Sequence, residues 1–277
     1  MSSSKACNLG FPRIGKLREL KFALEKHWNG ETDEETLLGV AKSLRREHWQ
    51  LQVKAGIGVP PSNDFSLYDH VLDIAVSVGA IPNRFHCAGG PASLQTYFAM
   101  ARGTQRAPAL EMTKWFDTNY HFVVPEFEAG MRYELRSQKA LEEYLEAKEL
   151  GIETRPVLLG PVSFVLLGKP TEAGVTRKLV LRSILPLYEE LLSQLCSVGA
   201  EWVQIDEPCL CVDLDHAARD LYRDAYAVLT GNRSLPKLML TTYFGDLGPN
   251  LDLALELGTA GLHLDLVRAP TQLDALL

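Results

Sequence analysis

Three basic side chains near the start of the chain are suited to holding an anion. The segment LGFPRIGKLRELKFAL, which begins at residue 9, has a Pro-Arg-X-Gly turn that opens into a predicted helix presenting Arg13, Arg18 and Lys21 together. On a helix, Arg18 and Lys21 share one face. Because the net charge of the chain is -7, cations gathered at one place favour a specific anionic ligand over nucleic acid, which needs a broad basic surface. For the basic residues alone, a solvated helix face balanced by Glu19 and Glu25 is the favoured alternative.

Two adjacent carboxylates form a second candidate for chemistry. Asp206 and Glu207 stand in the run QIDEP at the end of a predicted strand, and such a pair resembles a general acid and base. Adjacent strand residues point to opposite faces, however, so one site cannot easily use both. We therefore expect a structural or vestigial role for the two carboxylates.

The cysteines and the apolar runs indicate a cellular compartment. Five cysteines without framework spacing are typical of a reducing environment. Cys209 and Cys211, two apart on a predicted strand, fit buried thiols better than a metal pair or a disulfide. The N-terminus lacks the apolar core of a secretory signal, and the longest apolar run, residues 156–168, is too short and too interrupted to span a bilayer. We expect a soluble cytoplasmic protein without a membrane partner.

The elements that position these residues alternate in the second half of the chain. Strands are predicted at 131–136, 156–160, 201–206, 237–243 and 261–267. A first helix is predicted after a cap at Ser137, with Leu141, Tyr144 and Leu145 on one face. Further helices are predicted at 171–198, 214–229 and 251–257, the first of these with a break or kink near Pro186. Alternation of this kind requires parallel strands. Polar residues gather where the strands end, as in a (βα) barrel.

The first half of the chain has a different rhythm. Residues from about 16 to 126 are predicted to form a largely helical insertion after a first strand near residues 8–11. Thr32 and Glu35 predict a capping box at the start of one helix. Apolar residues then recur at helical spacing: Leu37, Ala41, Leu44 and Leu51.

The start of the chain resembles the N-terminal signature of the cobalamin-independent methionine synthases. Four further segments match that family in the same order: EMTKWFDTNYH from Glu111, PVLLGPVSF from Pro156, EWVQIDEP from Glu201 and LTTYF from Leu240. The resemblance covers nearly all of the 277 residues. It implies a methyltransferase that moves a methyl group from 5-methyltetrahydropteroyltri-L-glutamate to L-homocysteine, making methionine without cobalamin.

The resemblance also implies which residues bind the folate substrate. In the family, the run Arg18, Glu19, Leu20, Lys21 and the residue matching Lys114 contact the folate polyglutamate. Asp117 stands where most members have Asn, and a negative charge three residues from Lys114 is expected to weaken binding of the tail.

Several aromatic and imidazole side chains near these motifs are expected to pack rather than bind. They are Trp115, Tyr120 and His121, and the core or strand-end histidines His70 and His263.

The family uses zinc to bind homocysteine and stabilise its thiolate, with His, Cys and Glu ligands in a C-terminal barrel. In this chain the corresponding strand ends in Thr241, Thr242 and Tyr243, whose hydroxyls cannot replace a thiolate and an imidazole. The resemblance therefore implies that the zinc ligands are absent from this chain. We assign it no catalytic residue and expect it to be catalytically incompetent alone.

The expected fold is a (βα)8 TIM-type barrel, the N-terminal barrel of a two-barrel enzyme. About six strands are predicted, whereas closure needs eight, so residues 1–277 are expected to form one incomplete barrel domain partnered by the C-terminal catalytic barrel. An alternative is a stand-alone folate-binding or partner-binding module that needs its C-terminal half in trans. A small independent methyltransferase is a third, disfavoured by the missing zinc ligands.

Overall fold

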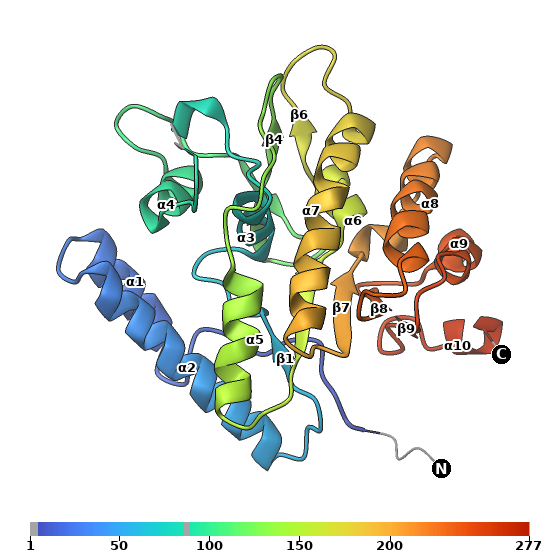
Figure 1. Ribbon diagram of the computed structural model, residues 1–277, viewed down its shortest axis with the longest axis horizontal. Coiled ribbons are helices and arrows are strands. Elements are labelled where there is room, and N and C mark those ends of the chain that lie inside the picture. Colours follow the sequence, from blue (N-terminus) through green and yellow to red (C-terminus); the bar gives the residue numbers. More distant parts are fainter. Residues whose placement is uncertain (1–4, 86–88, 277) are drawn as a thin grey trace.

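A parallel sheet flanked by helices forms the centre of the computed structural model, which describes residues 5–85 and 89–276 (Figure 1). The strands of the sheet follow the order β1 (Pro61–Ser62), β5 (Arg155–Leu159), β7 (Trp202–Asp206), β8 (Lys237–Thr241) and β9 (Gly261–His263). Each neighbouring pair is parallel. In register, Leu158 lies beside Ile205 and Ile205 beside Leu240, so an apolar row crosses the middle of the sheet.

Helices connect these parallel strands, as parallel pairing requires. Figure 1 shows the three longest of them side by side. The helices of this half are α5 (Lys139–Glu149), α6 (Pro161–Leu167), α7 (Arg177–Ser197), α8 (His216–Gly231), α9 (Leu251–Glu256) and α10 (Gln272–Leu276). The large side chains Tyr144 on α5, Tyr188 on α7 and Tyr222 on α8 are fully buried, and the Tyr188 hydroxyl donates to the Leu159 carbonyl oxygen of β5.

The first half of the chain contributes four helices and a hairpin within the described residues. These elements are α1 (Glu19–Trp28), α2 (Glu34–Lys54), α3 (His70–Ser77), α4 (Leu94–Arg102), and the antiparallel pair β2 (Met112–Lys114) and β3 (His121–Val123). The remaining short elements are the parallel pair β4 (Glu126–Phe127) and β6 (Lys169–Pro170), and 3₁₀ turns at Asn83–Phe85, Pro208–Cys211 and Gly248–Asn250.

The alternation predicted for the second half is confirmed. The expected strands at 156–160, 201–206 and 237–243 correspond to β5, β7 and β8, and the helices between them are present. Helix α7 begins later than expected, after its cap Thr176, and continues through Pro186 without interruption. A parallel α/β architecture is therefore correct, while closure into a complete barrel stays a prediction.

The prediction of a first strand at residues 8–11 is wrong. The carbonyl groups of Asn8 and Leu9 accept hydrogen bonds from the side chains of Arg155 and Gln204, and the Phe11 N–H donates to Asp64. Side chains thus occupy the backbone groups that a strand partner would use. The first strand of the sheet is instead β1, inside the segment expected to be an insertion.

The prediction of a strand at 131–136 is also wrong. The N–H groups of Glu134 and Arg136 donate to the carbonyls of Val78 and Ser77, so this segment is tied to the end of α3 instead of a strand. Gly79 makes that contact possible, because it has φ 72° and a Cβ there would lie 3.0 Å from the Glu134 carbonyl oxygen. Alternation in the sequence therefore reflects docking on a helix end.

Strand β9 ends at His263, earlier than the predicted Val267. The Asp265 carboxylate accepts hydrogen bonds from the N–H groups of Phe244, Val267 and Arg268, which folds the chain into a turn. Cys209 and Cys211 likewise lie in a 3₁₀ turn and not on a strand. Both are free thiols, with Cys209 buried and Cys211 half-buried.

Helix boundaries in the first half differ from the predicted capping box. Asp33, not Thr32, caps α2 and accepts a hydrogen bond from the Thr36 N–H at 2.9 Å. The core positions Leu37, Ala41 and Leu44 are confirmed as buried. Leu51, by contrast, is 55% exposed.

The helix after residue 137 shows a similar shift. Gln138 holds the cap position of α5, although the Ser137 hydroxyl accepts a hydrogen bond from the Lys139 N–H. Tyr144 is buried as predicted, whereas Leu145 is exposed.

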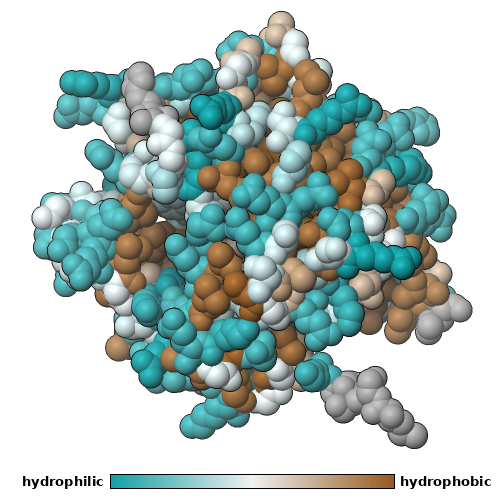
Figure 2. All heavy atoms as spheres, viewed as in Figure 1, coloured by the Kyte–Doolittle hydropathy of each residue, from teal (hydrophilic) through white to brown (hydrophobic). Residues whose placement is uncertain are grey.

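The surface alternates between polar and apolar areas. Figure 2 shows hydrophilic side chains over most of the viewed face, interrupted by hydrophobic side chains over α5 and between α9 and α10. Exposed apolar residues after β9 are Leu266, Val267, Leu273 and Leu276. Among the described helices, none combines the length and the apolar composition that crossing a bilayer requires.

Candidate functional site

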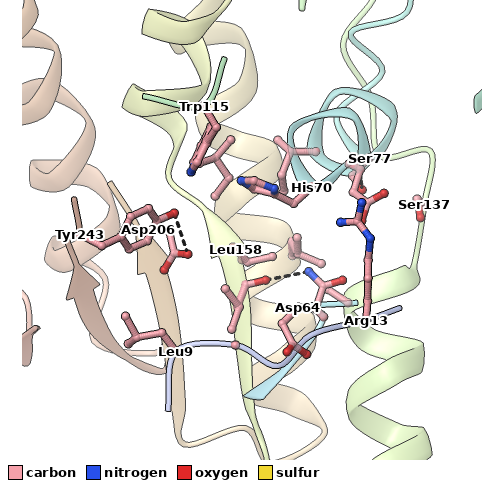
Figure 3. A pocket seen from close by; sticks show the side chains of 18 of the residues that line it. Leu9, Arg13, Asp64, His70, Ser77, Trp115, Ser137, Leu158, Asp206 and Tyr243 are labelled. Carbon is pink, nitrogen blue, oxygen red and sulfur yellow. Dashed lines mark hydrogen bonds between the residues drawn. The ribbon is translucent and has the colours of Figure 1, made fainter. Parts of the chain in front are cut away.

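A cavity of about 390 Å³ lies at the carboxyl ends of the strands of the parallel sheet. It is reached by residues that end or follow β1, β5, β7 and β8, and Figure 3 shows their side chains around the opening. Polar and aromatic lining residues are Arg13, Asn63, Asp64, His70, Asp73, Ser77, Trp115, Ser137, Asp206, Tyr243 and Phe244. Leu158 and Ile74 are among the apolar ones. This is where parallel α/β folds bind ligands.

Asp206 forms one wall of this cavity. Its carboxylate accepts hydrogen bonds from Gln204 Nε2 at 2.7 Å and from the Tyr243 hydroxyl at 3.2 Å. Gln204 is held in turn by the Arg155 guanidinium, which donates to its Oε1. Burial raises the pKa of Asp206 to about 7, against the opposing effect of these hydrogen bonds.

Glu207 points away from Asp206, as expected for adjacent strand residues. Its carboxylate accepts hydrogen bonds from the N–H groups of Val162 and Ser163 at the start of α6, and from the hydroxyls of Tyr222 and Tyr226 on α8. Burial raises its pKa to about 7 as well. These contacts tie β7 to α6 and α8, which is a structural role.

Arg13 lies in the cavity wall and not on the exposed helix face predicted for it. Its guanidinium donates to the Tyr68 carbonyl oxygen and to the Tyr120 hydroxyl, the latter at 3.3 Å. Tyr120 donates to the buried Asp69 carboxylate at 3.0 Å. Arg13 is therefore separated from Arg18 and Lys21, and it joins the start of the chain to the β2–β3 hairpin.

The aromatic residues of the hairpin only partly follow the prediction. Trp115 is buried and packs edge-on against His70, with ring centroids 4.5 Å apart. Tyr120 packs and also donates the hydrogen bond to Asp69. His121 is exposed, so the expectation that it packs is wrong. His263 is a satisfied strand-end histidine, because its Nδ1 lies 2.9 Å from the Thr242 carbonyl oxygen.

The run Arg18 to Lys21 combines two cations that reach the surface with two structural residues. Arg18 is exposed, and the Lys21 side chain is 42% exposed and pairs only loosely with Glu25 at 3.6 Å. Leu20 is buried in the core. The Glu19 carboxylate accepts a hydrogen bond from the Leu17 N–H and stabilises the turn before α1. We call Arg18 and Lys21 the cationic turn.

Gly15 is required for this turn. It has φ 83°, and a Cβ added there would lie 2.1 Å from Glu19 Oε2. The turn also places Arg18 in a left-handed backbone conformation with φ 65°. Residues other than glycine rarely adopt this conformation. The predicted Pro-Arg-X-Gly turn is thus present, but α1 begins only at Glu19.

Lys114 lies on the exposed strand β2, opposite His121 in the hairpin register. Asp117 follows at the hairpin tip and forms an ion pair with Arg268, whose guanidinium also lies 5.5 Å from the Phe244 ring centroid. The negative charge that was expected to oppose anion binding is therefore paired with a cation.

The described residues offer no metal site. Among them, no three His, Cys, Asp or Glu side chains gather as a ligand group. Burial raises the pKa of Cys209 to about 12 and of Cys211 to about 11, so both thiols are protonated at neutral pH. At the end of β8, Thr242 donates to the His263 carbonyl and Tyr243 to Asp206. These hydroxyl groups do not fit zinc, whose protein ligands are thiolate, neutral imidazole and carboxylate. Cys87 lies outside the described residues.

A group of buried carboxylates was not predicted from the sequence. Asp69 caps α3 and also accepts the Val123 N–H, while Asp73 accepts hydrogen bonds from Tyr97 and Ser66 and pairs with Lys139 at 3.4 Å. Asp64 lines the cavity, and burial raises its pKa to about 6. The signal was present in the run DFSLYDHVLD, where acidic residues recur close together in an apolar segment.

Parallel strands joined by helices, with a polar cavity at their carboxyl ends, define an α/β protein with an architecture like that of a barrel. Residues 5–277 match the model of a family described as "Cobalamin-independent synthase, N-terminal domain", and the chain belongs to this family. The resemblance noted in the sequence is thereby confirmed.

Two relatives that are named as methyltransferases are much longer than this chain. It is 55% identical to the 5-methyltetrahydropteroyltriglutamate--homocysteine methyltransferase of Chelativorans sp. (strain BNC1), covering 100% of this chain and 38% of that protein. Identity to the enzyme of the same name from Xylella fastidiosa (strain M23) is 57%, over 98% of this chain and 36% of that protein. The chain thus spans less than two-fifths of the length of these curated relatives.

A solved structure supports the fold. The B12-independent methionine synthase from Shewanella sp. W3-18-1, in complex with selenomethionine, superposes with a TM-score of 0.56 at 15% identity, over 78% of this chain and 55% of that chain.

Proposed function

We propose that this chain forms the folate-binding N-terminal part of a cobalamin-independent methionine synthase. The reaction would transfer the methyl group of 5-methyltetrahydropteroyltri-L-glutamate to L-homocysteine. The observation that carries the proposal is the family match across residues 5–277, together with relatives that are named for this activity. Because those relatives are longer, a stand-alone module is the less favoured reading.

The cationic turn supports a role in binding the anionic tail of the substrate. Arg18 is exposed and Lys21 is half-buried with a side chain that is 42% exposed. The N–H groups of Glu19 and Lys21 have no hydrogen-bond partner among the described residues. Free N–H groups in the first turn of a helix favour anions. Every residue of a polyglutamate tail carries a carboxylate, so the run Arg18 to Lys21 and the exposed Lys114 would supply complementary donors.

The chemical step is assigned to the remainder of the enzyme. The described residues do not fit zinc, so we propose that the zinc ligands and the homocysteine site belong to a C-terminal catalytic barrel, and that this chain alone does not transfer methyl groups. The sheet from β1 to β9 would be part of a (βα)8 barrel. The exposed apolar residues after β9 support contact between this chain and further protein. The assembled enzyme would act in the cytoplasm.

Single substitutions in the full-length enzyme test the proposal. Lys21→Ala or Lys114→Ala should raise the KM for the triglutamate substrate more than the KM for the monoglutamate, because only the tail supplies the extra carboxylates. Each lost charge-assisted contact should cost about 1 to 3 kcal/mol. Lys42→Ala, which changes an exposed lysine on α2, is the control. Equal losses for both substrates would show that these lysines do not contact the tail.

A further inference from the structure

An exposed arginine is stacked on a tryptophan beside the proposed folate surface. The Arg102 guanidinium carbon lies 3.9 Å from the ring centroid of Trp28, at the end of α1. Trp28 packs edge-on against the buried Phe98, with ring centroids 5.5 Å apart. The ring centroids of Trp28 and Tyr68 are 6.3 Å apart. The guanidinium therefore rests on an aromatic platform that is itself fixed by neighbours on two sides.

Arg102 has no acidic partner among the described residues, and its side chain is exposed. It is the last residue of α4, where a cation also benefits from the helix dipole. A helix-end arginine needs no tryptophan for that benefit. Stacking instead holds the plane of the guanidinium and leaves its N–H edge free, which is the geometry that binds a carboxylate through two hydrogen bonds.

Arg102 lies between the elements that carry the proposed lysines. Lys21 and Trp28 are seven residues apart on α1, so they share a face about 10 Å apart along the helix. On the other side, Tyr68 donates a hydrogen bond to Met112 Sδ at 3.6 Å. Met112 and Lys114 point to the same face of β2, because they are two apart on a strand. Figure 1 shows α1 and α4 as neighbours on one side of the molecule.

The Arg102 charge also acts on the Tyr68 hydroxyl. Burial raises the pKa of the Tyr68 hydroxyl, and the nearby Arg102 charge opposes that rise. Because the Trp28 ring lies against both the Tyr68 ring and the Arg102 guanidinium, these three residues form one surface, which we call the Trp28 platform.

We propose that the Trp28 platform is a carboxylate subsite, in which Arg102 binds the glutamates of the folate tail that lie beyond the first. The inference rests on the proposed function, because it assumes that the tail is held between the cationic turn and Lys114. Arg102 then determines how strongly the protein prefers long tails, while the pterin end of the substrate does not touch it.

Equilibrium binding of 5-methyltetrahydropteroyl monoglutamate and triglutamate to the full-length enzyme tests this subsite. Arg102→Gln should weaken triglutamate binding about ten-fold, the loss of one charge-assisted contact, and change monoglutamate binding less than about two-fold. Trp28→Leu should cause a similar selective loss although the arginine remains, and Arg102→Lys should recover only part of it, because a lysine lacks the planar fork. Circular dichroism of each variant checks that the fold is retained.

Arg106→Gln is the matched control, since Arg106 is an exposed cation in the loop that follows α4 and does not stack on Trp28. The two proposals fail differently. If the wild type prefers the triglutamate, Lys21→Ala abolishes the preference and Arg102→Gln keeps all of it, then the subsite is wrong and the proposed function stands. A wild type that binds both forms equally well overturns the tail-binding function and the subsite together.

Discussion

Arg18 illustrates how a single residue combines strain with exposure. Its φ of 65° places it in the left-handed region, which costs a non-glycine residue about 1 kcal/mol. Its side chain forms no hydrogen bond or ion pair within the described residues. Strain at an exposed cation fits the binding role proposed for Arg18.

Replacing Arg18 with glycine should separate the two effects. Arg18→Gly should leave the free energy of unfolding unchanged or raise it by up to about 1 kcal/mol, because glycine adopts positive φ without strain. The same variant should bind the triglutamate substrate more weakly. Urea unfolding and equilibrium binding measure the two quantities. Arg18→Ala is the comparison, since it removes the cation and keeps the strain. A glycine variant less stable than the alanine variant would contradict the argument.

Asp206 makes the free energy of unfolding depend on pH. Its pKa is about 7 in the folded chain, above its ordinary value of 3.8. Between these values the folded chain holds a proton that the unfolded chain has released. The contribution of Asp206 to the free energy of unfolding is therefore fully present below about pH 4. It is lost as the pH rises through about 7, by up to about 4 kcal/mol.

Asp206→Asn tests this dependence. Asparagine retains the shape of the side chain and cannot ionise, so the decline in unfolding free energy between pH 4 and pH 7 should become shallower. Chemical unfolding of both proteins at several pH values gives the comparison. If the two declines have the same slope, Asp206 does not titrate in the manner argued.

At the scale of elements, the start of α2 shows a difference between neighbouring polar residues. Asp33 accepts the Thr36 N–H, whereas the Thr32 hydroxyl is buried without a hydrogen-bond partner among the described residues. Asp33→Ala should therefore lower the melting temperature by about 2 to 4 °C, as loss of an N-cap does in a protein of this size. Thr32→Ala should lower it by less than about 1 °C. Thermal unfolding followed by circular dichroism distinguishes them, and the reverse order would restore the capping box predicted from the sequence.

The sequence predicted the elements whose pattern is set by their own burial. Strand β7 and helix α7 follow this rule, because β7 buries the alternate apolar residues Val203 and Ile205 and α7 buries apolar residues at helical spacing. Segments whose backbone is bonded by distant side chains could not be predicted. Residues 8–11 are held by Arg155, Gln204 and Asp64, which are far away along the chain.

The candidate sites divide in the same way. Arg18 and Lys21 were found because they are close in sequence and share a motif. The pairing of Trp28 with Arg102 joins residues 74 positions apart, from two helices with no common motif. The contacts of Arg13 could not be predicted either, since its partners Tyr68 and Tyr120 belong to other elements. Local spacing shows which side chains are available, and only the fold shows which of them meet.

At the scale of the whole molecule, Arg13 connects the interior to the proposed binding surface. Its side chain enters the cavity and bonds the β2–β3 hairpin through Tyr120. The backbone then turns outward to Arg18 and Lys21 within a few residues. This one arginine therefore fixes the cationic turn relative to the strand that carries Lys114, which a site of separate cations requires.

The apolar residues after β9 predict self-association of the isolated chain. Val267 is 93% exposed, and Leu266, Leu273 and Leu276 are exposed in the same segment, next to the outer edge of β9. An open parallel edge beside apolar side chains favours pairing with further protein. Sedimentation velocity at rising micromolar concentrations should therefore detect dimers or larger species.

A double substitution shows whether this segment is responsible. Val267→Asp with Leu273→Lys should shift the chain toward the monomer without lowering its unfolding free energy, because exposed side chains contribute little to the core. Leu179→Lys, which alters an exposed leucine on α7, should leave the association unchanged. If the proposed C-terminal barrel covers the same surface, adding it should abolish the association. A chain that stays monomeric at every concentration, with one sharp unfolding transition and no binding of a hydrophobic dye, would mean that the sheet edge and this apolar segment are already covered within the chain itself.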